Sequence, residues 1–264
     1  MTSAELRSAF LIDRLFVPGE VVMTYTQHDR MVTGGAAPAG AAPLRLPGSA
    51  VGGNAAPFLA RRELAVFNIG GPGRAAVDGR AFDLGTHDAL YVPAGTSDLF
   101  FSNADPSNPA KFWLAGAPCH VPYSPVLVRK ADAQRLDFAA QVQSNRTLYR
   151  YMTADRVESC QLTMGATFLA PGAVWNQMPG HVHPRKSEMY MYFNMAPDAR
   201  VVHIIGEPSE TRHLIVSNEQ GVINPPWAIH IGAGAGGEHA IAWAMAGENQ
   251  VQEDRFRVSL YDVE

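Results

Sequence analysis

Short apolar runs separated by turn residues make up most of this chain, and long helical periodicity is scarce. The runs are rich in valine, isoleucine, phenylalanine and tyrosine, and glycine, proline and asparagine interrupt them. This pattern predicts an all-β sandwich or barrel, with helix only at the N-terminus and around residues 131–145. The predicted strands include residues 64–69, 89–92, 99–102, 111–115, 161–169, 189–194, 201–205 and 241–246.

The two halves of the chain contain related segments. Residues 61–68 and 185–194 each pair a basic cluster with a glutamate that opens an apolar strand. Later in each half, a segment that begins with proline ends on a polar side chain, Asp98 in the first and His230 in the second. We therefore expect two stacked β-barrels in one chain.

The most specific chemical signal begins with His181-Val182-His183 and continues to Glu188. Residues two apart in a strand point to the same face, so the two imidazoles should lie side by side. Glu188 follows after a short turn, and His230 ends a downstream Pro-x-x-x-x-His segment. Imidazoles and a carboxylate on one face suit zinc, manganese, iron or nickel. We predict a metal site made of His181, His183, Glu188 and His230.

The first half carries a different set at the corresponding positions. The repeat places Ala56, Phe58, Glu63 and Asp98 where the second half has its four candidate ligands. Alanine and phenylalanine have no group that binds a metal. We therefore expect an N-terminal barrel without metal at residues 1–125, a C-terminal barrel with metal at residues 126–264, and one metal per chain.

Composition bounds the partners and the compartment. The chain has 264 residues, of which 47% are hydrophobic and 17% charged, and a formal net charge of −4, so we expect a globular protein that does not bind nucleic acid. No apolar run approaches the ~20 residues needed to span a bilayer. Cys119 and Cys160 are too few for a disulfide framework and are expected to be buried thiols in a cytoplasmic protein. Residues 34–57, dense in glycine, alanine and proline, are expected to form a long loop.

The spacing His-x-His, four residues, Glu, and a later Pro-x-x-x-x-His resembles the metal pattern of the cupins. The surrounding sequence is similar to the 5-keto-4-deoxyuronate isomerases over roughly residues 14–250. The supporting segments are residues 67–73, 104–112, 169–179, 203–213, 218–220 and 245–250. Val182, Pro184, Lys186 and Ser187 depart from the neighbours usual in that family.

This resemblance implies a zinc-containing bicupin that assembles as a homohexamer and acts in pectin and uronate breakdown. The implied reaction is ketol isomerisation of 5-dehydro-4-deoxy-D-glucuronate to 3-deoxy-D-glycero-2,5-hexodiulosonate. Zinc would act as a Lewis acid for two neighbouring oxygens of the substrate, whether the path is an enediolate or a hydride shift. A zinc-bound water, Glu207 or Tyr190 is the candidate for proton transfer.

The implied substrate is an anion, so a cation should hold its carboxylate. Arg185, two residues beyond His183, and Arg212 are the candidates, because arginine binds carboxylates through two parallel hydrogen bonds. Aromatic side chains are candidates for the pocket wall, namely Trp175, Tyr192 and Trp227. His203 is expected to be a core histidine or to support a metal ligand.

Three other functions fit the same ligand set. Cupins with three histidines and a glutamate include iron, manganese and nickel dioxygenases and decarboxylases, and a cupin can also bind sugars without catalysis. The nearest enzyme alternative is the isomerase of inositol breakdown that acts on 5-deoxyglucuronate. For any of them we expect an oligomer, because Met189, Met191 and Phe193 should face outward from the barrel and need cover.

Overall fold

The structure is a computed structural model that describes residues 1–48, 57–140, 142–176, 178–234 and 237–264. Contacts divide the chain into two compact units. The N-terminal unit comprises Arg14–Ala133 and Tyr151–Met164, and the C-terminal unit comprises Met1–Asp13, Gln134–Arg150 and Gly165–Glu264. This division differs from the expected boundary after residue 125, because β11 (Val126–Val128) pairs with β8 (Ala89–Val92) of the N-terminal unit.

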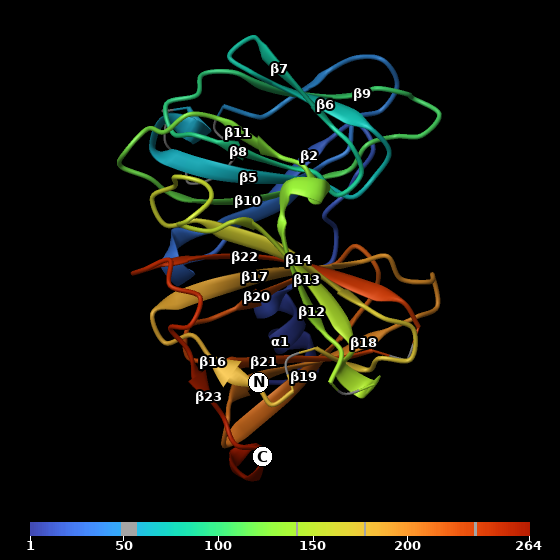
Figure 1. Ribbon diagram of the computed structural model, residues 1–264, viewed down its shortest axis with the longest axis vertical. Coiled ribbons are helices and arrows are strands. Elements are labelled where there is room, and N and C mark those ends of the chain that lie inside the picture. Colours follow the sequence, from blue (N-terminus) through green and yellow to red (C-terminus); the bar gives the residue numbers. More distant parts are fainter. Residues whose placement is uncertain (49–56, 141, 177, 235–236) are drawn as a thin grey trace. The chain divides into compact units, whose positions relative to one another are not determined.

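Two antiparallel sheets form the N-terminal unit (Figure 1). The six-stranded sheet has the order β11-β8-β5-β10-β3-β2 and adds to the strands already named β2 (Val21–Tyr25), β3 (Val32–Ala36), β5 (Arg62–Asn68) and β10 (Phe112–Pro118). The four-stranded sheet has the order β4-β9-β6-β7 and consists of β4 (Leu44–Arg45), β6 (Gly73–Val77), β7 (Arg80–Leu84) and β9 (Leu99–Asn103). Three short 3-10 turns complete the unit: His28–Arg30, Phe58–Arg61 and Lys130–Asp132.

Alternating apolar residues from both sheets fill the core of the N-terminal unit. Leu64 and Val66 of β5 pack in one cluster with Val77 of β6 and with Leu99 and Phe101 of β9. Residues two apart on a strand share a face, so each strand contributes its apolar face to the space between the sheets. The alternation read from the sequence thus produces the predicted sandwich.

The described part of the glycine-rich segment is only partly a loop, and the prediction for residues 34–57 is wrong at its start; residues 49–56 lie outside the described residues. Gly34 and Gly35 lie within β3, where both pair with β10. A Cβ atom would lie 2.0 Å from the Val22 carbonyl oxygen at Gly34 and 2.3 Å from the Leu15 carbonyl oxygen at Gly35. The strand therefore needs glycine for close backbone approach, which composition alone presents as a loop signal.

The C-terminal unit contains three sheets. The seven-stranded sheet has the order β1-β20-β17-β22-β14-β13-β12, and a four-stranded sheet has the order β15-β21-β18-β19. A short pair, β16 (His181–Val182) and β23 (Phe256–Arg257), completes the unit. The remaining strands are β1 (Leu11–Ile12), β12 (Gln134–Phe138), β13 (Arg146–Met152), β14 (Thr163–Leu169), β15 (Trp175–Asn176), β17 (Lys186–Phe193), β18 (Val201–Glu207), β19 (Glu210–Val216), β20 (Gly221–Asn224), β21 (Ile229–Gly234) and β22 (His239–Gly247).

Among the described residues, α-helix occurs only at the N-terminus, where one of the two predicted helices lies. In α1 (Ser3–Phe10), Thr2 accepts from the Glu5 amide and the Glu5 carboxylate accepts from the Thr2 amide, so both groups cap the first turn. The helix predicted around residues 131–145 is wrong. That segment contains β12, which pairs with β13, and the 3-10 turn Val142–Ser144; another such turn, Leu260–Asp262, lies near the C-terminus.

Burial removes one expectation about the surface. Met189, Met191 and Phe193 are 0%, 0% and 2% exposed, so the idea that they face outward is wrong. Phe193 packs edge-on against Phe168, with ring centroids 5.7 Å apart. Among the described residues, no helix is long and apolar enough to cross a membrane.

Candidate metal centre

Two of the four candidate ligands come from a short strand and the residue after it. His181 lies in β16, opposite Arg257 of β23, and His183 follows directly. Both side chains are buried, with relative exposures of 4%. The prediction that His181 and His183 lie side by side is met, with ring centroids 4.6 Å apart.

The other two candidate ligands come from the two larger sheets of the same unit. Glu188 lies in β17 opposite Asn224 of β20, and His230 lies in β21 opposite Ile205 of β18. Hydrogen bonding on both sides fixes the backbone of β17 and β21, so the directions of both side chains are set by the sheets. Glu188 and His230 are also buried.

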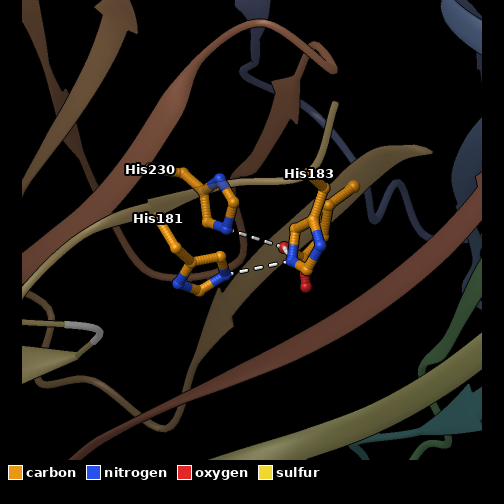
Figure 2. A group of neighbouring side chains, drawn as sticks. His181, His183 and His230 are labelled. Atoms are coloured by element: carbon orange, nitrogen blue, oxygen red, sulfur yellow. Dashed lines mark hydrogen bonds and ion pairs between the residues drawn. The ribbon is translucent and has the colours of Figure 1, made fainter. Parts of the chain in front are cut away.

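The three histidine side chains point toward one another (Figure 2), and Glu188 belongs to the same group. His181 Nε2 lies 3.0 Å from His183 Nε2, and His230 Nε2 lies 2.9 Å from Glu188 Oε2. His183 Nε2 lies 3.7 Å from the same carboxylate oxygen, and one ligand atom from each of the four residues lies within 4.8 Å of the others. These separations suit a single ion, because Zn–N bonds of about 2.0–2.1 Å put tetrahedral ligand atoms roughly 3.3 Å apart.

Protonation states support the same fit. His183 Nδ1 lies 3.2 Å from the carbonyl oxygen of Asp254, which can only accept, so this nitrogen carries the proton and Nε2 keeps its lone pair. Burial, followed by the repulsion of His230 and His183, holds the pKa of His181 far below its ordinary value. Burial also lowers the pKa of His183 to about 4. Neutral imidazoles are the form that binds a metal.

Some polar atoms in this group lack hydrogen-bond partners among the residues that the structure describes. Within the described residues, Glu188 Oε2 and His230 Nε2 make no well-oriented hydrogen bond despite their 2.9 Å separation. Buried polar atoms without partners are costly, and a divalent cation would satisfy these two and the facing lone pairs of His181 and His183 together. The donor set therefore fits a metal.

A network behind His183 fixes its orientation. Asp254 accepts from Arg185 Nε at 2.8 Å and also from Arg185 Nη2, and Asn249 Nδ2 donates to it at 2.5 Å. Lys186 is only 1% exposed and donates to the Val251 carbonyl at 2.5 Å. These contacts hold the segment whose carbonyl oxygen accepts the hydrogen bond from His183 Nδ1. Such a hydrogen bond to the second ring nitrogen is a recurring support for metal-binding histidines.

A second network of polar side chains lies inside the same unit. The Tyr192 hydroxyl lies 2.8 Å from His203 Nδ1, and His203 Nε2 lies 2.9 Å from Asn224 Oδ1. Burial lowers the pKa of His203 to about 3, so the neutral ring accepts from Tyr192 and donates to Asn224. Tyr190 lies beside His230, with ring centroids 5.4 Å apart, and burial raises its pKa well above the ordinary value.

The structure separates the other sequence candidates from one another. Glu207, Arg212 and Trp227 line a cavity of about 240 Å³ whose lining includes none of the four metal-site residues. Arg212 pairs there with Glu210 at 2.7 Å. Trp175 lies half-buried in β15, beside the strand that carries His230. Tyr190 is thus the only one of the two proposed proton-transfer side chains that contacts a candidate ligand.

Several residues of the site were missed in the sequence. Asp254 and Asn224 lie outside the motif segments, and Asn249 lies in the segment 245–250 without an expected role; only the fold brings the three to the histidines. A further cavity beside His181 is lined by Arg146, Arg150, Arg255 and Arg257. The sequence contains a signal for this arginine-lined cavity. The arginines at 146 and 150, and those at 255 and 257, are spaced so that each pair would lie on one face of a strand.

The corresponding positions of the N-terminal unit have other roles. Phe58 is buried, Asp98 is partly exposed and paired with Arg45, and Ala56 lies outside the described residues. Glu63 is fully buried and accepts from the Tyr91 hydroxyl at 2.8 Å. It also accepts from three backbone amides, those of Cys160, Gln161 and Leu162, at 2.8–2.9 Å.

The two cysteines lie beside Glu63. Cys119 is buried and its Sγ atom lies 3.0 Å from Cys160 Sγ, so the thiols contact each other. Both lie near Glu63, and the three residues together offer three potential metal-ligand atoms, one carboxylate oxygen and two thiol sulfurs. However, the four hydrogen bonds already made by Glu63 and the pKa of Cys119, which burial raises to about 12, favour a structural anchor.

Comparisons with known proteins agree with this geometry. The 4-deoxy-L-threo-5-hexosulose-uronate ketol-isomerase of Caldicellulosiruptor bescii is 45% identical over 96% of this chain and 91% of its own length. The enzyme of the same name from an Enterobacter species is 44% identical over 100% of this chain and 95% of its own.

Solved structures show the same fold at low identity. An IolB-like protein from Salmonella typhimurium matches with a TM-score of 0.78 at 14% identity, covering 94% of this chain and 96% of its own. A Bacillus subtilis oxalate decarboxylase variant matches with a TM-score of 0.63 at 12% identity, covering 89% of this chain and 74% of its own. The all-β cupin prediction is confirmed. A model of the KduI/IolB family matches residues 19–260, and the chain belongs to that family.

Proposed function

We propose that this protein is a zinc-dependent ketol-isomerase that converts 5-dehydro-4-deoxy-D-glucuronate to 3-deoxy-D-glycero-2,5-hexodiulosonate in the cytoplasm. The observation that carries the proposal is the buried group of His181, His183, Glu188 and His230, with its converging and unpaired ligand atoms. The names of the relatives at 44–45% identity supply the reaction.

A bound zinc would supply Lewis acidity for the oxygens of a carbonyl and its neighbouring hydroxyl. The chain's own residues supply orientation and proton control. Three imidazole ligands and the Glu188 carboxylate would bring a single negative charge to a divalent ion, so the occupied site would stay cationic. Burial of all four side chains removes competing water.

Tyr190 is the proposed residue for proton transfer near the reacting carbons. Its ring contacts His230 edge-on, with ring centroids 5.4 Å apart, and its side chain is buried. Because burial raises its pKa, Tyr190 keeps its proton at neutral pH. The hydroxyl therefore acts as a hydrogen-bond donor and proton source. Tyr192 is held by His203 and is proposed to shape the pocket.

We also propose that the protein assembles as a homohexamer, as the family resemblance implies. Met189, Met191 and Phe193, which were expected to need cover by another subunit, are buried within one chain. Light scattering should give an assembly larger than the 28.5 kDa chain. A monomer at micromolar concentration would contradict the assembly without affecting the reaction.

The test of the reaction is a comparison of two substrates. Purified protein loaded with zinc is given 5-dehydro-4-deoxy-D-glucuronate, made by a pectate-lyase route, and separately 5-deoxyglucuronate. Proton NMR should show a new keto sugar from the first substrate, at a catalytic efficiency well above that for the second. Preference for 5-deoxyglucuronate would instead support the isomerase of inositol breakdown.

A further inference from the structure

Four arginines surround one cavity of about 260 Å³ beside the candidate metal centre, and the same cavity is lined by His181. Ligand sites for drug-sized molecules are typically about 300–1,000 Å³, so this cavity suits a small metabolite. Its charged lining residues are all basic: Arg146, Arg150, Arg255 and Arg257.

Two strands carry three of these four arginines, and Arg255 directly precedes the second strand. Arg146 and Arg150 lie on β13 at positions i and i+4, which share a face of the strand. Arg257 lies on β23 directly opposite His181 of β16, and such cross-strand partners project from the same face. The cavity is therefore tied by backbone pairing to a candidate metal ligand.

The positive charge in this cavity is poorly compensated. Within the described part of the chain, Arg146, Arg255 and Arg257 form no ion pair. Arg150 is 3.8 Å from Glu253, whose side chain is 74% exposed, and the Nε atom of Arg150 is buried without a hydrogen-bond partner. An exposed pair at this distance contributes little stability.

The arginines also act on one another and on the histidines. Burial first, and then the charge of Arg255, lowers the pKa of Arg146. Arg255 and Arg257 are among the charges that lower the pKa of His181. Cations held this close without an acidic partner repel one another, and a bound anion would relieve that repulsion.

The earlier candidates are less suited to the same task. Arg185 already makes two hydrogen bonds to Asp254, and Arg212 lies with Glu210 in the other cavity. By contrast, Phe138 stacks on Arg146 at 4.8 Å from its ring centre and fixes the plane of a guanidinium that faces the cavity. A planar cation held in this way suits a carboxylate.

We infer that the pocket formed by Arg146, Arg150, Arg255 and Arg257 binds the carboxylate of the substrate while its carbonyl end lies at His181. This inference rests on the proposed function. Arg146 and Arg255 are the principal binding residues, because both line the cavity and, among the described residues, neither forms an ion pair with an acidic side chain. The pocket thereby selects uronates over neutral sugars.

The test measures binding separately from turnover. Isothermal titration of the zinc-loaded protein uses D-glucuronate, which keeps the carboxylate, and D-glucose, which lacks it. Wild-type protein should bind glucuronate more tightly than glucose, and R146Q and R255Q should weaken glucuronate binding roughly 10–100-fold through loss of charge-assisted hydrogen bonds. R146K and R255K should restore part of the affinity, because lysine keeps the charge and loses the two-pronged geometry.

Controls separate this inference from the proposed reaction. R74Q removes an exposed arginine of the N-terminal unit that pairs with Asp83, and its glucuronate affinity and zinc content should match wild type. In turnover assays R146Q and R255Q should raise KM more than they lower kcat while retaining zinc.

Three results would overturn the assignment of the pocket: equal binding of glucose and glucuronate, unchanged affinity in both glutamine variants, or a larger effect of R212Q than of R146Q. The two proposals can fail separately. If R146Q and R255Q lose glucuronate binding but the wild-type protein shows no isomerisation, the pocket assignment holds and the proposed reaction is refuted.

Discussion

Replacement of Asp254 by alanine should weaken zinc binding although Asp254 is not a ligand. Its carbonyl lies 3.2 Å from His183 Nδ1, and its carboxylate holds Arg185 and Asn249. Without the carboxylate, the segment that fixes His183 loses its two side-chain anchors. The side chain of Asp254 is 12% exposed, so water replaces these contacts only in part.

Removing such support for a metal-binding histidine typically costs about 10–100-fold in metal affinity, which corresponds to ~1.4–2.8 kcal/mol. The fold should persist, since Arg185 is 39% exposed and can be hydrated, and Lys186 keeps its bonds to Asn249 and Val251. We expect a competitive titration with a zinc chelator to show the loss, while circular dichroism stays unchanged.

Asp83→Ala is the matched control, because Asp83 forms an exposed ion pair with Arg74 in the N-terminal unit. Its zinc affinity should equal that of wild type. Wild-type zinc affinity in a folded Asp254→Ala variant would show that this network does not orient His183 and would refute the reasoning.

Three further predictions concern the ligands, the N-terminal unit and pH. His183→Ala should remove most of the metal from a folded protein, and elemental analysis of wild type should give one metal per chain; a value near two would place a second metal outside the four ligands. Glu63→Gln replaces one accepting oxygen by an NH₂ donor, which leaves two of the four donors to Glu63 without an acceptor, and should lower the free energy of unfolding by roughly 2–4 kcal/mol, with zinc content unchanged. An unaltered denaturant midpoint would count against the role of Glu63 as an anchor. The pKa of His203 is depressed from 6.5 to about 3 and that of His183 to about 4, so the unfolded chain binds more protons below pH 6.5. The metal-free protein should therefore be fully stabilised by these groups above pH 6.5 and lose that stability as pH falls to about 4; a flat profile in chemical denaturation would contradict this.

Strand periodicity predicts the fold class and the side-by-side placement of His181 and His183, whereas His230 is predicted from its Pro-x-x-x-x-His segment. His181 and His183 are separated by one residue, Glu188 follows in the next long strand, and this local spacing survives in any strand geometry. The glycines of β3 show the limit of prediction from composition. A glycine-rich sequence occurs both in loops and in strands whose backbones approach closely, so composition does not distinguish the two. The helix predicted around residues 131–145 fails because β12 forms a strand by pairing with β13, and the sequence of β12 alone does not reveal that partner.

The supporting residues could not be predicted because long-range pairing creates them. Asp254 reaches His183 across 71 residues of sequence. The pairing of β16 with β23 places Arg257 opposite His181, and neither segment alone contains that information. Arg212 and Glu207 looked suitable by residue type, but β18 and β19 carry them to a different cavity.

The most direct test of the central claim is turnover under anaerobic conditions with zinc as the sole added cofactor. NMR should show 5-dehydro-4-deoxy-D-glucuronate converted to the 2,5-diketo product at the same rate with and without oxygen. Chelation should abolish the reaction, and zinc should restore it. A rate that disappears without oxygen would support a dioxygenase, and a rate that survives complete zinc removal would contradict a role for His181, His183, Glu188 and His230 as the catalytic metal site.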